Sequence, residues 1–176
     1  NPGFVSGTAT WTCLASNSGS LDFVDAHFDG DPDISGLAGA SGTALLSSSG
    51  SGEANYLVVA GVMDDAITVF AIDPGTGALT PELTLAQGDS VDLAAGGTAV
   101  LGSLEGARAA VASKDGEFLY VASRTSDAVT VFAVDDSGPT LALKLVEVQT
   151  GVVLNQAQHL LLSPAMGEPY LYVAAA

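Results

Sequence analysis

The sequence predicts an all-β protein built from repeated four-stranded antiparallel sheets, and three observations lead to that prediction. The segment Leu57–Asp73 returns 62 positions later as Leu119–Asp135, with ten of seventeen residues identical. Turn-forming residues separate the apolar runs at short intervals, and no segment shows the helical period of about 3.6 residues. The repeated runs, such as Ile67–Ile72, are apolar on both faces, which is typical of a sheet packed between two others. Four short strands in units of roughly 50–60 residues predict the blades of a β-propeller.

Residues 1–30 are predicted to form the outer half of a blade. Two strand-like runs, Gly7–Ala15 and Leu21–Phe28, flank a hairpin turn over Asn17–Ser20. This pair aligns with the second half of the unit that follows it. The inner half of the same blade is therefore not among these thirty residues.

Two complete blades are predicted at residues 42–86 and 107–149, and an inner half-blade at residues 157–175. Within the first blade, the turn Asp73–Gly77 combines a Pro that presets φ with a Gly that tolerates positive φ. The predicted strands are Thr43–Leu46, Tyr56–Val62, Ala66–Ile72, Leu79–Leu85, Ala107–Ala112, Phe118–Ser123, Ala128–Val134, Leu141–Val148, Gln158–Leu162 and Tyr170–Ala174.

The units add up to about three blade equivalents, namely a half, two complete blades and a half. Propellers close with about four to eight blades, so three would leave apolar faces and strand edges open. We therefore expect partners that cover them. The candidates are further blades of a longer chain, or other copies of this chain that close the ring or continue as a filament.

The charge of the chain excludes one class of ligand and disfavours another. Four Lys and Arg stand against twenty Asp and Glu, which gives a net charge of −16. Nucleic-acid binding needs a basic surface that displaces counterions, so it is excluded, and anionic membrane surfaces are repelled. The acidity is typical of a hydrated surface suited to solubility or to salty surroundings, or of cation binding.

Two further observations concern the location of the protein. No apolar run approaches the roughly eighteen residues that a membrane-spanning helix requires, so no membrane insertion is predicted. The chain opens at Asn1 without a basic, apolar leader, and its only cysteine is Cys13. We therefore expect a mature chain that is extracellular or on the cell surface, without an intrachain disulfide.

An acidic loop is the candidate metal site. Asp29, Asp31 and Asp33 alternate with Gly30 and Pro32. Carboxylates at alternate positions of a tight loop can direct their oxygens toward one hard cation, and Ca²⁺ takes about six to eight oxygen ligands. The alternative is a solvated acidic loop, because Pro32 restricts how the loop can wrap. Ca²⁺ is the one cofactor that the residues suggest.

The segment Ser113–Asp135, SKDGEFLYVASRTSDAVTVFAVD, resembles the blade signature of lactonase-type propellers, the 6-phosphogluconolactonase-like and YVTN-repeat proteins. The resemblance implies the propeller fold. It also implies a Pro-Arg-His motif on innermost strands that line the central channel. His159 falls on the family His and Gln158 on the family Arg, whereas Arg108 falls on that Arg one unit earlier and is followed by Ala109.

Two functions are compatible with these observations. The leading hypothesis is a non-catalytic secreted or cell-surface scaffold for adhesion, binding or self-assembly, because no unit carries both the Arg and the His. The alternative is a lactonase-type hydrolase acting on a sugar lactone, with His159 and Arg108 in its site and further site residues outside this chain. The whole sequence offers few cations for an anionic substrate: Arg108, Lys114, Arg124 and Lys144.

Overall fold

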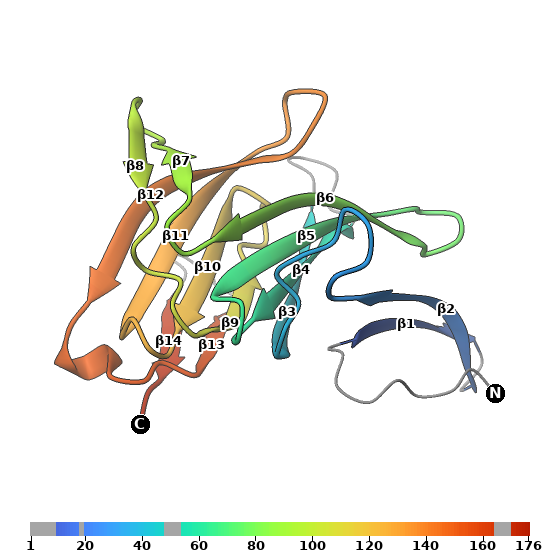
Figure 1. The fold of residues 1–176 in the computed structure, drawn as a ribbon, viewed down its shortest axis with the longest axis horizontal. Helices are drawn as coiled ribbons and strands as arrows, with labels where there is room; N and C mark the ends of the chain where they lie inside the picture. Colours follow the sequence, from blue (N-terminus) through green and yellow to red (C-terminus); the bar gives the residue numbers. More distant parts are fainter. Residues whose placement is uncertain (1–9, 18–19, 48–53, 164–169) are drawn as a thin grey trace.

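The computed structural model describes residues 10–17, 20–47, 54–163 and 170–176. In this part of the chain the structure is all-β, with a single short 3₁₀ turn, as the sequence predicts (Figure 1). The elements are β1 (Thr10–Asn17), β2 (Ser20–Phe28), β3 (Ala40–Ser47), β4 (Ala54–Gly61), β5 (Ala66–Ile72), β6 (Leu79–Ala86), β7 (Ser90–Asp92), β8 (Thr98–Val100), β9 (Ala107–Ala112), β10 (Phe118–Ser123), β11 (Ala128–Asp135), β12 (Ala142–Thr150), η1 (Val152–Leu154), β13 (His159–Leu162) and β14 (Leu171–Ala174).

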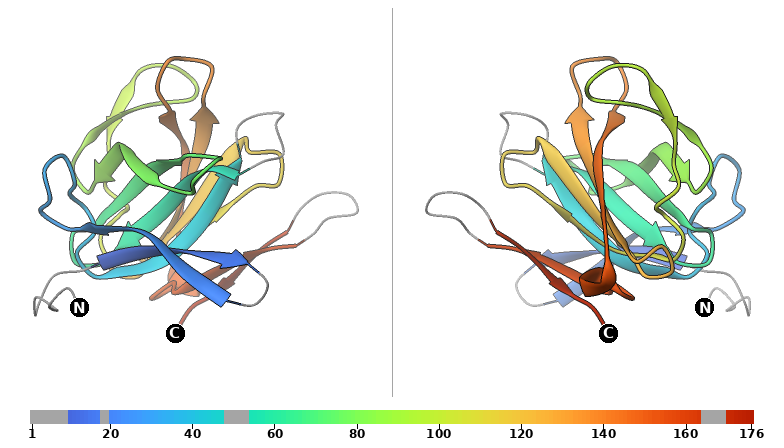
Figure 2. Two further views of the ribbon diagram at one scale, coloured as in Figure 1. Left: turned by 90° about the vertical axis from the view of Figure 1, so that its right-hand side faces the viewer. Right: turned by 90° about the vertical axis from the view of Figure 1, so that its left-hand side faces the viewer.

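The strands pair with their neighbours in sequence. Strands β3 to β6 form the first four-stranded sheet and β9 to β12 the second, both antiparallel and both in chain order. Strands β1 and β2 form a two-stranded sheet, and so do β13 and β14. The two pairs lie on opposite sides of the four-stranded sheets (Figures 1 and 2). The turns predicted around residues 17–20, 47–50 and 163–167 lie largely outside the described residues, as do residues 7–9.

The core lies between stacked sheets, which explains why the middle strands are apolar on both faces. Val58 and Ile67 of the first sheet pack with Leu119 and Phe132 of the second. Side chains that alternate with them, such as Val59, face the other way into a second cluster. Because successive strand residues point to opposite faces, a strand buried on both sides needs an apolar residue at nearly every position.

One irregularity recurs and identifies equivalent strands. The pairing of β5 with β6 shifts register at Val69/Phe70, and that of β11 with β12 shifts at Val131/Phe132. The β1–β2 pair shifts at Cys13/Leu14. Each shift is a β-bulge, which bends the strand and increases its twist. The β1–β2 pair therefore has the register of the outer two strands of a four-stranded sheet.

The connection between the two large sheets contains a hairpin that the sequence did not predict. Strands β7 and β8 are three residues each, and only Val91 of β7 is buried. The hairpin leads to a parallel bridge between Leu93 and Leu145 of β12, supported by a 2.9 Å hydrogen bond from Ala94 N to Leu145 O. The segment therefore occupies part of the free edge of β12, a position otherwise open to another strand.

Tight turns end the strands where Gly and Asp residues permit them. In the predicted turn Asp73–Gly77, Oδ1 of Asp73 accepts hydrogen bonds from the backbone nitrogens of Gly75 and Thr76 at 3.0 and 2.8 Å. Gly77 has a φ of 77°, a region that L side chains disfavour.

No helix in the described residues is long and apolar enough to cross a membrane.

Candidate functional site

The candidate site lies where the three inner strands begin. Strands β3, β9 and β13 lie side by side, with β9 in the middle (Figure 1). Each is entered by a connection that arrives from the preceding sheet. We call the end of the sheets at which these strands begin the entry end.

Strand pairing establishes which inner-strand residues are equivalent. In each unit, an alanine near the end of the second strand faces one inner-strand residue. These pairs are Ala60 with Gly42, Ala122 with Ala109, and Ala174 with His159. The residues immediately before them are Ser41, Arg108 and Gln158, and the first two sit at shifts in register. The structure therefore places His159 one unit beyond Ala109, and Gln158 one unit beyond Arg108.

The first two inner strands touch through their backbones at this level. The Ser41 hydroxyl donates a 2.9 Å hydrogen bond to the carbonyl oxygen of Arg108. A Cβ added to Gly42 would lie 2.3 Å from that same oxygen, so only glycine fits. The position occupied by Gly42 therefore faces the next inner strand. At the equivalent position His159 is exposed, and no described strand follows β13 on that side.

Arg124 also lies at the entry end. The sequence alone does not indicate this location, because Arg124 stands in the turn between β10 and β11. Its backbone nitrogen donates a 2.9 Å hydrogen bond to the carbonyl oxygen of Gly106, directly before β9. Its guanidinium donates from Nε and Nη2 to Oε1 of Gln156, at 3.3 and 3.0 Å. Gln156 stands three residues before His159. Arg124 thus spans the gap between the starts of β9 and β13.

Two aspartates, one in the β4–β5 turn and one in the β10–β11 turn, hold the segments that lead into β9 and β13. Asp65 Oδ1 accepts a 2.6 Å hydrogen bond from Gly106 N, and Asp127 Oδ1 accepts a 2.7 Å bond from Gln156 N. Both aspartates have positive φ, 54° and 50°. They are 62 positions apart, which is the repeat period. The sequence repeat contained this signal, because Asp65 and Asp127 are among its identical residues.

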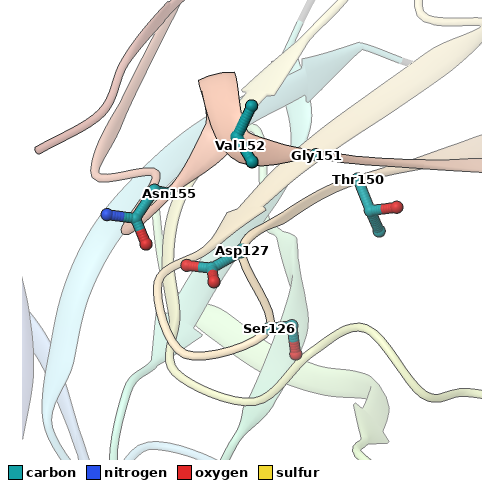
Figure 3. Close-up of a pocket in the computed structure, with 6 residues that line it drawn as sticks. All are labelled: Ser126, Asp127, Thr150, Gly151, Val152 and Asn155. Carbon is teal, nitrogen blue, oxygen red and sulfur yellow. The ribbon is translucent and has the colours of Figure 1, made fainter.

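A shallow pocket lies at the rim of the entry end. It encloses about 440 Å³ between the β10–β11 turn and the connection that follows β12, and Asp127 lies between Ser126 and Asn155 in Figure 3. A second hollow of about 310 Å³ occupies the corresponding place in the preceding unit, beside Asp29 and Asp64. Neither is lined by Arg108 or His159. Both hollows therefore lie at the boundary between one four-stranded unit and the next, which we call the seam between units, and not along the inner strands.

The remaining cations lie elsewhere. Lys144 Nζ is 2.6 Å from Asp135 Oδ2, and this hydrogen-bonded ammonium holds the pKa of the Asp135 carboxyl well below its usual range. The same contact raises the pKa of Lys144. Lys114 lies in the β9–β10 turn, at the opposite end of β9 from Arg108. Arg108 and Arg124 are therefore the two cations at the entry end.

Two of the three aspartates of the predicted calcium loop accept hydrogen bonds from nearby backbone nitrogens. Asp29 Oδ1 accepts a hydrogen bond from Leu37 N at 3.1 Å, and Asp31 Oδ2 one from Phe28 N at 3.1 Å. Asp33 has a positive φ of 67°. Within the described residues no group of three or more His, Cys, Asp or Glu side chains is arranged to hold a metal ion. Ca²⁺ binding at Asp29, Asp31 and Asp33 stays a prediction from the sequence.

Comparisons with known proteins agree with this architecture. The family model described as "Lactonase, 7-bladed beta-propeller" matches residues 82–152. The periplasmic gluconolactonase of Pseudomonas aeruginosa is 22% identical with a TM-score of 0.58, over 96% of this chain and 38% of that one. A Lactobacillus plantarum protein is 22% identical with a TM-score of 0.57, over 81% of this chain and 36% of that one. No curated protein matches the chain.

These matches confirm the propeller fold and the resemblance to the lactonase-type family. The chain spans little more than a third of the length of these two structures. The leading hypothesis from the sequence, a non-catalytic secreted or cell-surface scaffold for adhesion, binding or self-assembly, is wrong. The family match and the gluconolactonase neighbour favour the hydrolase alternative instead.

Proposed function

We propose that this chain is part of a lactonase-type hydrolase that opens a sugar lactone, with further site residues in blades outside this chain. The observation that carries the proposal is the equivalence of inner-strand positions. It brings Arg108 and His159, which are separate in sequence, to the same end of adjacent inner strands. The family match over residues 82–152 includes Arg108 and Arg124 and supports the same conclusion.

The chemistry needs a base and a cation at one place. Water adds to the lactone carbonyl carbon and loses a proton, and the ring C–O bond then breaks to give a hydroxy acid. An imidazole such as that of His159 can accept the proton of the attacking water. A guanidinium such as that of Arg108 can stabilise the oxyanion that develops on the carbonyl oxygen. Both groups are of the kind that ester hydrolysis requires.

The backbone contacts of the two residues support the proposal. The Arg108 carbonyl oxygen is bonded to Ser41, and the Arg108 side chain is half-buried. His159 pairs with Ala174 in the β13–β14 sheet, and Gln158 N donates a 2.8 Å hydrogen bond to Ala174 O. Candidate groups that project from paired strands keep their geometry better than groups on loops.

The expected partners are the blades that would flank β13–β14 and β1–β2, because exposed side chains such as Leu161, Tyr172 and Phe23 are there for them to cover. An extracellular or periplasmic location fits the acidic composition and the periplasmic neighbour.

The test is hydrolysis of glucono-δ-lactone by the protein that carries the complete propeller. The readout is the proton release that accompanies hydrolysis, measured by titration at constant pH. We expect turnover, and a loss of about 100-fold or more in kcat/KM for His159→Ala, the size of a lost general base. Lys114→Ala is the matched control and should retain full turnover. Absence of turnover in the unaltered protein, or full turnover in His159→Ala, would refute the proposal.

A further inference from the structure

Gln156 occupies a position where the other two units have glycine. Gly39, Gly106 and Gln156 each directly precede the alanine that opens an inner-strand segment, and all three have positive φ, at 68°, 70° and 50°. In each unit the backbone nitrogen of that alanine donates a hydrogen bond to the carbonyl oxygen of the leucine three residues earlier. The pairs are Ala40 with Leu37, Ala107 with Leu104, and Ala157 with Leu154. A non-glycine residue in this conformation carries a steric penalty. Such a penalty is tolerated where the side chain has a task.

The task visible in the structure is to hold Arg124. One oxygen, Oε1 of Gln156, accepts from both Nε and Nη2 of the guanidinium. The backbone of Gln156 is fixed in turn by Asp127, at 2.7 Å from its nitrogen. Arg124 is fixed at its own backbone by Gly106. The guanidinium is therefore anchored from both sides of the seam between the units.

The partner of Arg124 is a neutral amide. In a chain with twenty acidic residues and four basic ones, a carboxylate would be the commoner partner. Among the described residues, no carboxylate lies within ion-pairing distance of Arg124, which is exposed. A neutral partner orients the guanidinium without cancelling its charge. Its remaining N–H donors stay available to an anion, for which the planar fork of arginine is well suited.

We propose that Gln156 is a positioning residue that holds Arg124 at the entry end, where Arg124 binds an anionic substituent of the lactone. The substituent is a phosphate or carboxylate away from the ester that reacts. This inference rests on the proposed lactonase function and adds a specificity determinant to it. Arg124 and Gln156 set the preference for anionic over neutral lactones.

The experiment compares three substrates on the protein with the complete propeller: a neutral gluconolactone, its 6-phosphate, and a glucarolactone that carries a free carboxylate. Arg124→Gln, Gln156→Gly and Gln156→Glu are measured beside the unaltered protein. Gln156→Gly removes the side chain and relieves the backbone, whereas Gln156→Glu keeps an acceptor but neutralises the guanidinium. Lys114→Gln is the matched control, because it changes the net charge as Arg124→Gln does.

We expect all three variants to raise KM about tenfold for whichever anionic lactone Arg124 binds, the usual size of a lost charged hydrogen bond. KM for the neutral lactone and the melting temperature of Gln156→Gly should not worsen, which a merely structural role would not allow. The phosphate and carboxylate arms identify the anion. An unchanged ratio of anionic to neutral KM in Gln156→Gly and Arg124→Gln, or an equal change in Lys114→Gln, would overturn the proposal.

A binding measurement separates this inference from the proposed function. If the unaltered protein hydrolyses no lactone, calorimetric titration with 6-phosphogluconate and glucarate tests Arg124 directly. About tenfold weaker binding of either acid by Arg124→Gln and by Gln156→Gly would uphold the positioning role although the lactonase proposal fails. Equal affinities in the unaltered protein and both variants would reject the positioning role.

Discussion

Asp65 in the β4–β5 turn accepts a 2.6 Å hydrogen bond from the backbone nitrogen of Gly106, the residue before inner strand β9. Asp127 repeats the contact one unit later with Gln156. These bonds cross the seam between units, so each turn orients the inner strand of the next unit. Apolar packing between the sheets is non-directional, whereas a carboxylate bonded to one amide defines a specific placement.

Asp65→Ala should lower the free energy of unfolding by about 1.5–3 kcal/mol, because Gly106 N loses a charged acceptor in a half-buried site. Asp65→Asn should cost less, since Asn tolerates positive φ and retains an acceptor oxygen. Urea denaturation measures both. The exposed Glu117 provides the control, and Glu117→Ala should change stability by no more than about 0.5 kcal/mol. Equal losses in Asp65→Ala and Glu117→Ala would contradict the role of the seam contact.

Gly42→Ala should be strongly destabilising, because its Cβ would lie 2.3 Å from the carbonyl oxygen of Arg108, a backbone atom. Overpacking of this kind costs about 1–3 kcal/mol, and here it would also separate the two inner strands. Gly75→Ala is the matched control, since its nearest neighbour is at 3.5 Å. Thermal unfolding of the two variants should differ clearly. A Gly42→Ala protein as stable as Gly75→Ala would show that the strands can move apart freely.

Gln156→Gly should leave stability unchanged or raise it by up to about 1 kcal/mol, because glycine adopts positive φ without the penalty of a side chain. The lost hydrogen bonds to exposed Arg124 offset part of the gain. Gly106→Ala should have the opposite effect. Its φ is 70°, and its Cβ would lie 2.9 Å from the backbone nitrogen of Thr125. Differential scanning calorimetry of the pair would contradict this account if both changes destabilised equally.

Asp25 should make the docking of the β1–β2 pair sensitive to acid. The Leu79 backbone N–H, 3.0 Å from Asp25 Oδ2, lowers the pKa of this carboxyl below 3.8, and contacts with Ala26 and His27 lower it further. A carboxyl with a depressed folded-state pKa stabilises the fold above its unfolded pKa. That contribution disappears as the pH falls through the folded-state value.

The corresponding measurement is the free energy of unfolding from pH 7 to pH 3 for the unaltered protein and for Asp25→Asn. The unaltered protein should be more stable at pH 7. The difference should shrink as the pH falls below about 4, because the Asp25 carboxyl of the unfolded chain takes up its proton there, before that of the folded protein does. Glu117→Gln corrects for the general effect of removing one negative charge. A difference that grows on acidification would have the wrong sign for this mechanism.

Much of the fold could be predicted from the sequence, because its signals are local. The repeat of Leu57–Asp73 can be read directly from the sequence. Its apolar residues on both faces indicate a strand that is buried between two sheets. The turn at Asp73 follows from side-chain chemistry within five residues. The sequence did not predict the β7–β8 hairpin, because the contacts that stabilise this hairpin are not local. Its strands are short, largely exposed and held by a bridge to Leu145, some fifty positions away.

The candidate site was predicted only in part. The family resemblance indicates Arg108 and His159, whereas no motif in the sequence indicates Arg124 or Gln156. What the sequence determined by itself is the repeated sheet and the equivalence of its positions, since both depend on the order of residues along one strand. Only the tertiary structure decided that Arg124, Gln156 and Asp127 meet at the start of β13. That meeting depends on contacts across the seam between units, and these arise only once the sheets have packed against one another.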